Sequence, residues 1–218
     1  AWGGKFEHFA RDNAVPAALA AHAGLPCVSP RSGYILEGGA IESNGAGTLL
    51  TTDPVLLHPG RNPGPTREAH LDILRAGLGV ETVLSLPAGL PNDDTDGHID
   101  NVARFTPGGA VLAVADPALP GLDGNRMALE AAGFAVEALP RPRLPGEPPA
   151  SYANYVVLNG AVLLPGFGLA EDRRAEAILT AHFPDREIVP LDARLLLEEG
   201  GALHCCTLNE FEPTARAG

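Results

Sequence analysis

The chain has 218 residues, of which 45% are hydrophobic and 19% are charged, a composition typical of a folded globular protein. Acidic residues outnumber basic ones by 27 to 15, and the net charge of −12 argues against nucleic acid or an anionic membrane surface as a partner. No apolar run is long enough to span a membrane. The three cysteines do not suggest a disulfide framework, so a reducing, cytoplasmic location is expected.

The first predicted elements are a helix over residues 13–24 and a short strand over 25–29. Two strands are predicted next, over 34–42 and 46–52, and an Asn-Gly turn signal lies between them. A helix over 66–77 follows, for which Thr66 is a suitable N-cap and two glycines mark the end. The chain therefore starts in the second half of one structural unit and then begins another.

The same order of strand, strand, helix and strand recurs along the chain. The remaining predicted elements are, in chain order, strands at 81–86, 98–105 and 110–115, a helix at 123–132, strands at 135–139, 151–158 and 161–164, a helix at 171–182, and strands at 186–191 and 203–208. The recurrence predicts a β-β-α-β unit, and such units bury their apolar strand faces by packing side by side. A single α+β domain with chance similarity between segments is the alternative.

We therefore expect an α/β fold in which residues 1–218 form one domain. Its predicted parts are full units at about 34–97, 98–150 and 151–202, and half units at 1–33 and 203–218. The proline-rich stretch 140–150 is interpreted as a surface connection and not as a domain boundary, because the repeat resumes directly after it.

The first strand of each predicted unit carries unusual polar residues. Glu37 precedes two glycines, His98 and Asp100 follow an acidic run, and Asn154 and Cys205 occupy the later units. If the units surround an axis, these strands converge and their side chains share a pocket. A cysteine thiolate is a nucleophile, a histidine transfers protons, and carboxylates bind a planar guanidinium in bidentate geometry. The set predicts chemistry on a guanidinium substrate.

Each of these residues also has a structural interpretation. A lone histidine such as His98 is more often a hydrogen-bonded structural residue. Cys206 is expected to point away from Cys205 into the core, and Cys27 is expected to be a core residue as well. His204 and Cys205 together suggest a metal site, but no second ligand pair has zinc-like spacing. The glycines after Glu37 lack the spacing of a dinucleotide fingerprint.

Six segments together resemble, in the correct order, motifs of the agmatine deiminases, the bacterial and plant branch of the Porphyromonas-type peptidylarginine deiminases. They are LEGGAIESNGAGTLLTT, RNPG, LPNDDTDGHIDNVARF, SYANYVVLNGAVLLPGFG, FPDREIVPLDAR and GGALHCCTLNE. The resemblance covers nearly the whole chain. It implies the pentein α/β propeller, in which ββαβ units surround a pseudo-fivefold axis with the active site at the centre, incomplete in this chain.

The resemblance also implies an activity, the hydrolysis of agmatine to N-carbamoylputrescine and ammonia through an amidino-cysteine intermediate. It makes Cys205 the nucleophile, His98 the general acid–base and Asp100 the catalytic carboxylate that holds the guanidinium. It assigns substrate contacts to acids of the EGG and DDTDGH motifs, namely Glu37, Asp94 and Asp96. No metal ion or organic cofactor is implied, and the reaction belongs to polyamine and putrescine biosynthesis.

Two other functions are left open by the residues. A deiminase of arginine or peptidyl-arginine needs an arginine for the substrate carboxylate, and Arg61 and Arg104 are candidates. The family's earlier segment, with a tryptophan-containing motif that supplies another carboxylate, is not found, so the sequence is expected to lack about the first unit. A catalytically inactive fragment that only binds or assembles, for example as a homo-oligomer, is therefore the second alternative.

Overall fold

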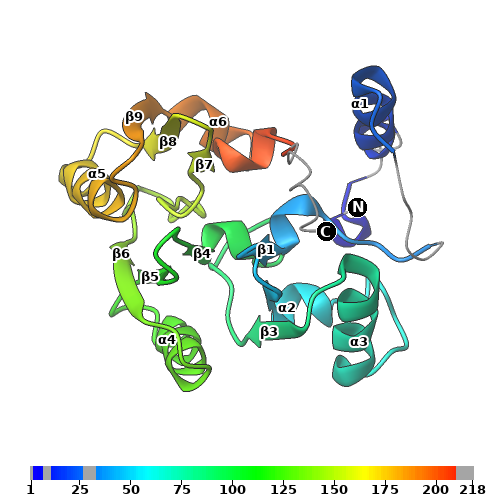
Figure 1. Cartoon of the computed structure of the whole chain (residues 1–218). Coiled ribbons are helices and arrows are strands. Elements are labelled where there is room, and N and C mark those ends of the chain that lie inside the picture. The colour runs from blue at the N-terminus through cyan, green and yellow to red at the C-terminus, as the bar shows by residue number, and fades with distance from the viewer. Residues whose placement is uncertain (1, 7–10, 27–32, 210–218) are drawn as a thin grey trace, which may run out of the picture.

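The computed structural model describes residues 2–6, 11–26 and 33–209, and it contains three small sheets of three strands each (Figure 1). The sheets are β1 (Glu42–Ser43), β2 (Thr48–Thr52) and β3 (Thr82–Leu86); β4 (Ala103–Phe105), β5 (Val111–Ala115) and β6 (Val136–Pro140); and β7 (Val156–Val157), β8 (Ala161–Gly166) and β9 (Glu187–Asp192). In every sheet the first strand is antiparallel to the second, and the second is parallel to the third. The predicted order of strand, strand, helix and strand is therefore present three times.

A parallel strand pair needs a crossover connection, and one helix supplies it in each sheet. These helices are α3 (Arg67–Leu78), α4 (Gly121–Ala131) and α5 (Ala170–His182). The start of α3 is capped as predicted, because the Thr66 side chain accepts a hydrogen bond from the Ala69 amide. Figure 1 shows the three helices at the outside of the molecule and β1, β4 and β7 nearest its middle.

The core lies between successive sheets and helices. Leu49 and Leu50 are neighbours on β2 and point to opposite faces of the sheet, yet both are buried. Leu49 packs with Leu74 of the sheet's own helix, whereas Leu50 belongs to a cluster with Leu129 of the next helix. A third cluster, which includes the fully buried Tyr152, joins the second and third sheets. The first two sheets are therefore each covered by their own helix and by the following unit.

The first strand of each unit is shorter than predicted, and this part of the prediction is wrong. Segments 34–42, 98–105 and 151–158 contain strands of only two or three residues, and 203–208 contains none. Single 3₁₀ turns take their place in three segments: η3 (Gly38–Ala40), η4 (Ile99–Asn101) and η5 (His204–Cys206). A 3₁₀ turn buries an apolar residue such as Ile99 while it turns the neighbouring polar groups toward the middle of the molecule.

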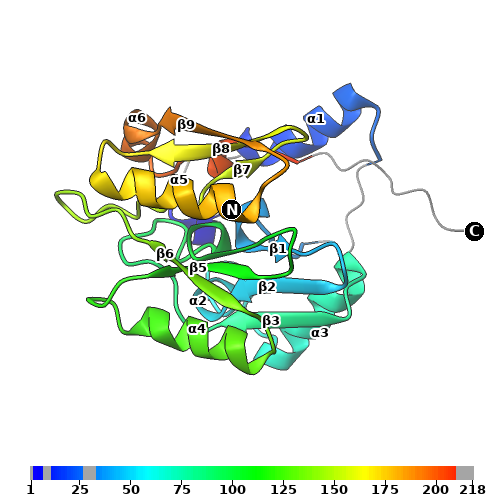
Figure 2. The same ribbon diagram turned by 60° about the vertical axis from the view of Figure 1, so that its left-hand side comes forward.

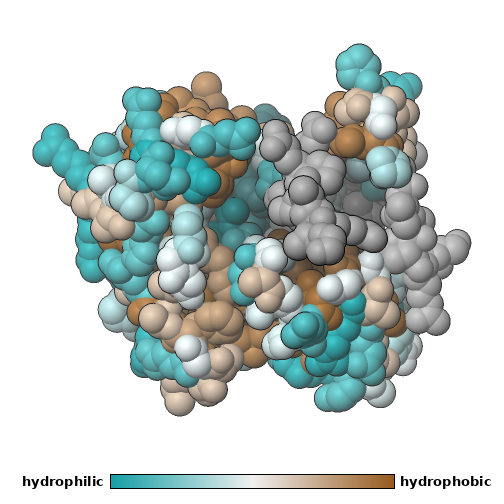
Figure 3. All heavy atoms as spheres, in the orientation of Figure 1, coloured by the Kyte–Doolittle hydropathy of each residue, from teal (hydrophilic) through white to brown (hydrophobic). Residues whose placement is uncertain are grey.

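The N-terminal helix α1 (Val15–Ala23) stands apart from the three sheets in Figure 1, and in the turned view of Figure 2 it projects beyond the end of the third sheet. Val15 and Leu19 are each 47% exposed, and Figure 3 shows apolar side chains of this helix at the surface. Cys27 and most of the predicted strand 25–29 lie outside the described residues. The shorter elements are η1 (Trp2–Gly4), η2 (Asp12–Ala14), α2 (Asp53–Leu56) and α6 (Arg194–Glu198). None of the described helices is long and apolar enough to cross a membrane.

Candidate active site

The polar residues predicted to converge lie on turns that face the middle of the molecule. Glu37 directly precedes η3, His98 directly precedes η4, Asp100 lies within η4 and Cys205 lies within η5. The turns η3 and η4 pack against each other. Asn154 lies in the turn that precedes β7, which is the corresponding place in the third unit. Four successive units therefore contribute one turn each.

Two polar side chains contact the Cys205 thiol, and a third contacts one of these two. Its Sγ lies 3.2 Å from Nδ2 of Asn154 and 3.8 Å from Oδ2 of Asp100. The same Oδ2 lies 2.8 Å from Nδ1 of His204. The residue keeps contact with solvent, but partial burial of the sulfur and the negative charge of Asp100 raise the pKa of the Cys205 thiol to about 12. The thiol is therefore the favoured form of Cys205 in this arrangement at neutral pH. We call Cys205, Asp100, His204 and Asn154 the Cys205 cluster.

Two buried polar atoms near this cluster have no hydrogen-bond partner within the described part of the chain. They are Oδ1 of Asp100, whose side chain is 1% exposed, and Nε2 of His98. Nε2 of His98 lies 3.7 Å from Oε2 of Glu37, which is longer than a hydrogen bond. Unpaired buried groups are costly unless a ligand or water completes them. The geometry therefore leaves one acceptor and one ring nitrogen available to a bound molecule.

The lack of a side chain at Gly39 lets both His98 and Asp100 pack closely against the backbone of η3. A Cβ atom at position 39 would stand 2.6 Å from Nδ1 of His98 and 2.7 Å from Oδ2 of Asp100. Real Cβ contacts are not this short, so any side chain would displace both groups. A Cβ at Gly38, by contrast, would meet nothing within 4 Å. The second glycine of the EGG motif is thus required by the packing of the site.

A second group of charges lies beside His98, and Arg61 holds it together. The Arg61 side chain is 1% exposed, and its Nε lies 3.1 and 2.9 Å from the two carboxylate oxygens of Glu37. Its Nη1 donates to Oδ2 of Asp96 at 2.7 Å. Lys5 forms an ion pair with the other oxygen of Asp96, and Nε2 of His58 lies 3.5 Å from Oδ2. We call Arg61, Glu37, Asp96, Lys5 and His58 the Arg61 cluster.

The Arg61 cluster keeps its two carboxyl groups ionised. Burial by itself would raise the pKa of Glu37, but the nearby His98 ring and the hydrogen-bonded Arg61 guanidinium outweigh burial and lower it to about 2. In the same way, Lys5 and Arg61 lower the pKa of Asp96 against the effect of burial. Both oxygens of each carboxylate are engaged within the cluster.

The remaining predicted residues are placed as follows. Asp94 is exposed; its backbone oxygen accepts a hydrogen bond from Lys5, and its Oδ2 faces Gly200. The buried Arg104 donates to Glu42 and to two backbone oxygens of the third unit. Arg104 and Arg61 are therefore both committed to contacts within the protein.

Two features were not foreseen. Cys206 is exposed, so its predicted place in the core is wrong; the 3₁₀ turn does not alternate its side chains as a strand does. Asn154 was expected in the shared pocket from its position in the third unit, equivalent to that of Glu37 and His98, but its direct contact with Cys205 was not predicted. Within the described ranges no group of three His, Cys, Asp or Glu residues is arranged to hold a metal ion.

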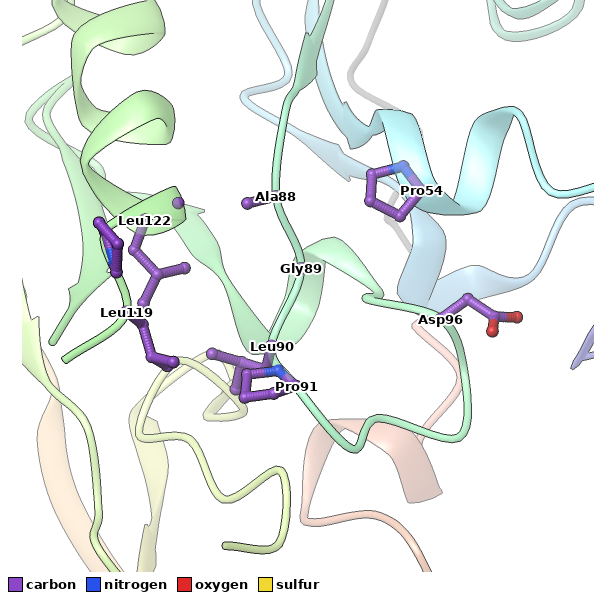
Figure 4. A pocket seen from close by; sticks show the side chains of 10 residues that line it. Pro54, Ala88, Gly89, Leu90, Pro91, Asp96, Leu119 and Leu122 are labelled. Atoms are coloured by element: carbon purple, nitrogen blue, oxygen red, sulfur yellow. The ribbon is translucent and has the colours of Figure 1, made fainter.

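A cavity of about 370 Å³ lies between the DDTDG loop (residues 93–97) and the start of α4. Leu90, Leu119 and Leu122 are among its apolar lining residues, and Asp96 points away from the two leucines of the α4 side (Figure 4). Neither Cys205 nor His98 lines this cavity. The candidate site is therefore defined by its converging side chains and not by this hollow.

Known proteins similar to the chain are deiminases. The model of the Porphyromonas-type peptidyl-arginine deiminase family matches residues 1–210. An agmatine deiminase of Pseudomonas putida is 35% identical over 221 residues, which cover 84% of this chain and 59% of the relative. A putative agmatine deiminase of Selenomonas ruminantium is 35% identical over 95% of this chain and 66% of its own length. The chain thus spans about three fifths to two thirds of the length of these relatives.

Two solved structures show the same arrangement of elements. A cysteine-to-serine variant of C. jejuni agmatine deiminase with substrate bound superimposes with a TM-score of 0.87 at 32% sequence identity, over 97% of this chain and 66% of that one. The agmatine deiminase of Enterococcus faecalis superimposes with a TM-score of 0.86 at 26% identity, over 94% and 66%.

Proposed function

The chain belongs to the Porphyromonas-type peptidyl-arginine deiminase family, and from this premise we propose that its site hydrolyses agmatine to N-carbamoylputrescine and ammonia. The observation that carries the proposal is the unpartnered Oδ1 of the buried Asp100, whose other oxygen lies 3.8 Å from the Cys205 sulfur. An acceptor without a donor, beside a nucleophile, suits the N–H groups of a guanidinium.

Substrate binding also supplies the charge that the thiol lacks. Partial burial and the carboxylate of Asp100 hold the Cys205 pKa at about 12. A guanidinium seated on Asp100 neutralises that carboxylate and adds a positive charge near Sγ, which lowers the pKa of the thiol. The nucleophile then ionises when the cation is present, and the empty enzyme is protected from side reactions.

The chemistry proceeds in two halves. The Cys205 thiolate attacks the central guanidinium carbon, a C–S bond forms, and the C–N bond to the departing nitrogen breaks as His98 delivers a proton to release ammonia. A water molecule then gives a proton to His98 and attacks the amidino-cysteine carbon. The C–S bond breaks, the thiolate is regenerated, and the ureido product leaves. Glu37, 3.7 Å from Nε2 of His98, stabilises the imidazolium that donates the proton in the first half and re-forms in the second.

The polar residues around the site suit agmatine better than arginine as the substrate. Arginine carries a carboxylate that a binding site usually meets with a cationic side chain. Arg61 and Arg104, the candidates for that role, are buried and bound to Glu37 and Glu42. Agmatine has no carboxylate and needs neither of them. Asp94, which is exposed on the DDTDG loop, is available to the distal amine of agmatine, and Asp96 acts through Arg61 and Lys5.

The fold around the site is proposed to be part of a pentein propeller, in which residues 1–218 form one partial deiminase domain. The support is the threefold recurrence of the ββαβ order and the central position of the short first strands (Figure 1). A cytoplasmic location and assembly of several copies belong to the same proposal, and neither a metal nor an organic cofactor is required by it.

The test is turnover of agmatine by this chain, measured as ammonia and ureido product, beside the Cys205→Ala variant and with arginine as the competing substrate. We expect product from agmatine, none from the variant, and much less from arginine. Preference for arginine would overturn the substrate assignment. Product formation by Cys205→Ala would overturn the mechanism, and no product from any substrate would support an inactive fragment instead.

A further inference from the structure

The side chain of Asn154 is fully buried and makes every hydrogen bond that an amide can make. Its Oδ1 accepts from the backbone amides of His204 at 2.9 Å and Cys205 at 3.3 Å. Its Nδ2 donates to Oδ1 of Asn101 at 2.9 Å and to Sγ of Cys205 at 3.2 Å. Two donors and two acceptors are the whole capacity of the group. Asn154 therefore both anchors the turn η5 and points an N–H group at the sulfur.

The direction of this amide is fixed from both ends. Backbone amides of His204 and Cys205 can only donate, so they require the oxygen of Asn154 on their side. On the other side, Nδ2 of Asn101 lies 3.4 Å from the buried carboxylate of Asp93, which as a carboxylate only accepts. The oxygen of Asn101 must then face Asn154, and Asn154 must present its NH₂ group there. A flipped amide would lose all of these bonds.

We propose that Asn154 is a further catalytic residue: its Nδ2–H group stabilises the Cys205 thiolate, and Asp93 and Asn101 fix the direction of that donor. An N–H donor favours the charged form of a sulfur that it contacts. Within the described part of the chain, Asn154 is the only side chain that donates a hydrogen bond to Sγ. The nearby carboxylate of Asp100 has the opposite effect, since it raises the pKa of the thiol. The proposal gives the third unit a chemical role that the family motifs alone do not express. It rests on the proposed deiminase function for its purpose.

The decisive variant is Asn154→Asp. A carboxylate keeps the acceptors for the His204 and Cys205 amides, so the turn stays anchored, but it removes both donors and adds a charge beside the sulfur. The matched control is Asn125→Asp. Asn125 is also buried and bonded through both ends of its amide, but to the backbone of Ala88, away from Cys205.

The measurement is the rate at which iodoacetamide, a neutral reagent, alkylates Cys205 across a pH series, read by peptide mass spectrometry in a Cys206→Ser background. This rate follows the thiolate fraction and requires no turnover, so it is independent of the deiminase assignment. We expect Asn154→Asp to react at least about tenfold more slowly at a fixed alkaline pH below the thiol pKa, one unit of pKa being a factor of ten. Asn125→Asp is expected to match the parent protein.

Alkylation of a folded Asn154→Asp variant at the parent rate would overturn the proposal, and so would an equal slowing in Asn125→Asp. If Asn154→Asp does not fold, Asn101→Ser removes the acceptor that orients the amide, and a slower reaction in the same sense is expected; an unchanged rate would then refute the proposal. With agmatine as substrate, the proposal further requires kcat to fall more than KM rises in Asn154→Asp.

Discussion

The Arg61 cluster and the Cys205 cluster lie on either side of His98 and differ in how their polar atoms are satisfied. In the Arg61 cluster both oxygens of Glu37 and of Asp96 are held by cations or amides of the protein. In the Cys205 cluster Oδ1 of Asp100 has no partner within the described part of the chain, and partial burial together with the charge of Asp100 raises the pKa of the thiol. Most residues of both groups are buried or half-buried, whereas Lys5 and Cys205 are exposed.

The difference distinguishes charges that stabilise the fold from polar groups that are available to bind a ligand. A group of charges that is complete within the protein gains nothing from a ligand, whereas an incomplete one is stabilised when a cation enters. Although Glu37 and Asp96 were predicted as substrate contacts by motif alone, their geometry suits a supporting role, in which Arg61 ties η3 to the loop that carries His98. The Cys205 cluster is the part of the site that a guanidinium would complete.

The largest effect is expected from removing the proposed nucleophile, Cys205. Cys205→Ala should reduce agmatine turnover by at least about 10⁴-fold, because no other group in the Cys205 cluster can form the covalent intermediate. The matched control is Cys206→Ser, in the same turn, where the exposed neighbouring sulfur has no assigned role and turnover should stay near the parent value. Both are measured by ammonia release, and loss of activity in Cys206→Ser would show that the two sulfurs had been assigned in the wrong order.

The Arg61 cluster is expected to contribute strongly to the unfolding free energy. Arg61→Met leaves Glu37 and Asp96 without their shared cation, and removing one partner of a buried ion pair costs about 3–5 kcal/mol of unfolding free energy. Denaturant unfolding measures this loss. Arg75→Met breaks an exposed ion pair with Asp72 and should change stability little. Equal effects in the two variants would remove the distinction between the clusters.

The packing of η3 against the turn that carries His98 and Asp100 is tested at the EGG motif. Gly39→Ala places a methyl group against both His98 and Asp100, and a displacement on the order of 1 Å at a catalytic centre reduces turnover by about 10²-fold. Gly38→Ala introduces the same methyl one residue earlier, into open space, and should remain close to full activity. Similar kinetics for the two variants would show that the close packing around position 39 is not needed for turnover.

The smallest effect is a pH dependence of stability. Glu37 has an ordinary pKa of 4.5 that is lowered to about 2 in the folded protein. Its contribution is therefore fully present above pH 4.5 and is lost as the pH falls toward 2, when the carboxylate takes up a proton. Comparison of parent and Glu37→Gln by thermal unfolding should show an advantage of the parent, on the order of 1–2 kcal/mol, that disappears in this window. A stability difference that stays constant between pH 4.5 and 2 would mean that the neighbours of Glu37 do not lower its pKa.

The helices and the second and third strands could be predicted from sequence, since their apolar periodicity and caps are local signals. Thr66 at the start of α3 and the apolar strands β2 and β3 are examples. The first strands could not, because Gly38, Ile99 and Cys205 lie in turns whose shape depends on partners from other units. The extended pattern of these segments was compatible with a strand, but packing around a crowded centre favoured 3₁₀ turns.

The site was foreseen as a set of residues but not as a network. Family motifs named Cys205, His98 and Asp100, and the structure brings these residues together. The partners of Arg61 are 24 and 35 residues away in sequence, and Asn154 meets Cys205 across 51 residues. No local pattern encodes contacts at such separations. Which acids are satisfied and which are open to a ligand followed only from the three-dimensional arrangement.

The link between His204 and Asp100 closes a loop of 104 residues, and that between Cys205 and Asp100 closes one of 105. Loops of this size form slowly, because the chain loses conformational entropy before the contact rewards it. Helices α3, α4 and α5 rest mainly on nearby sequence and can form early. During refolding, the secondary structure signal should therefore recover ahead of the reactivity of Cys205, so that the nucleophile reports on the last step of assembly.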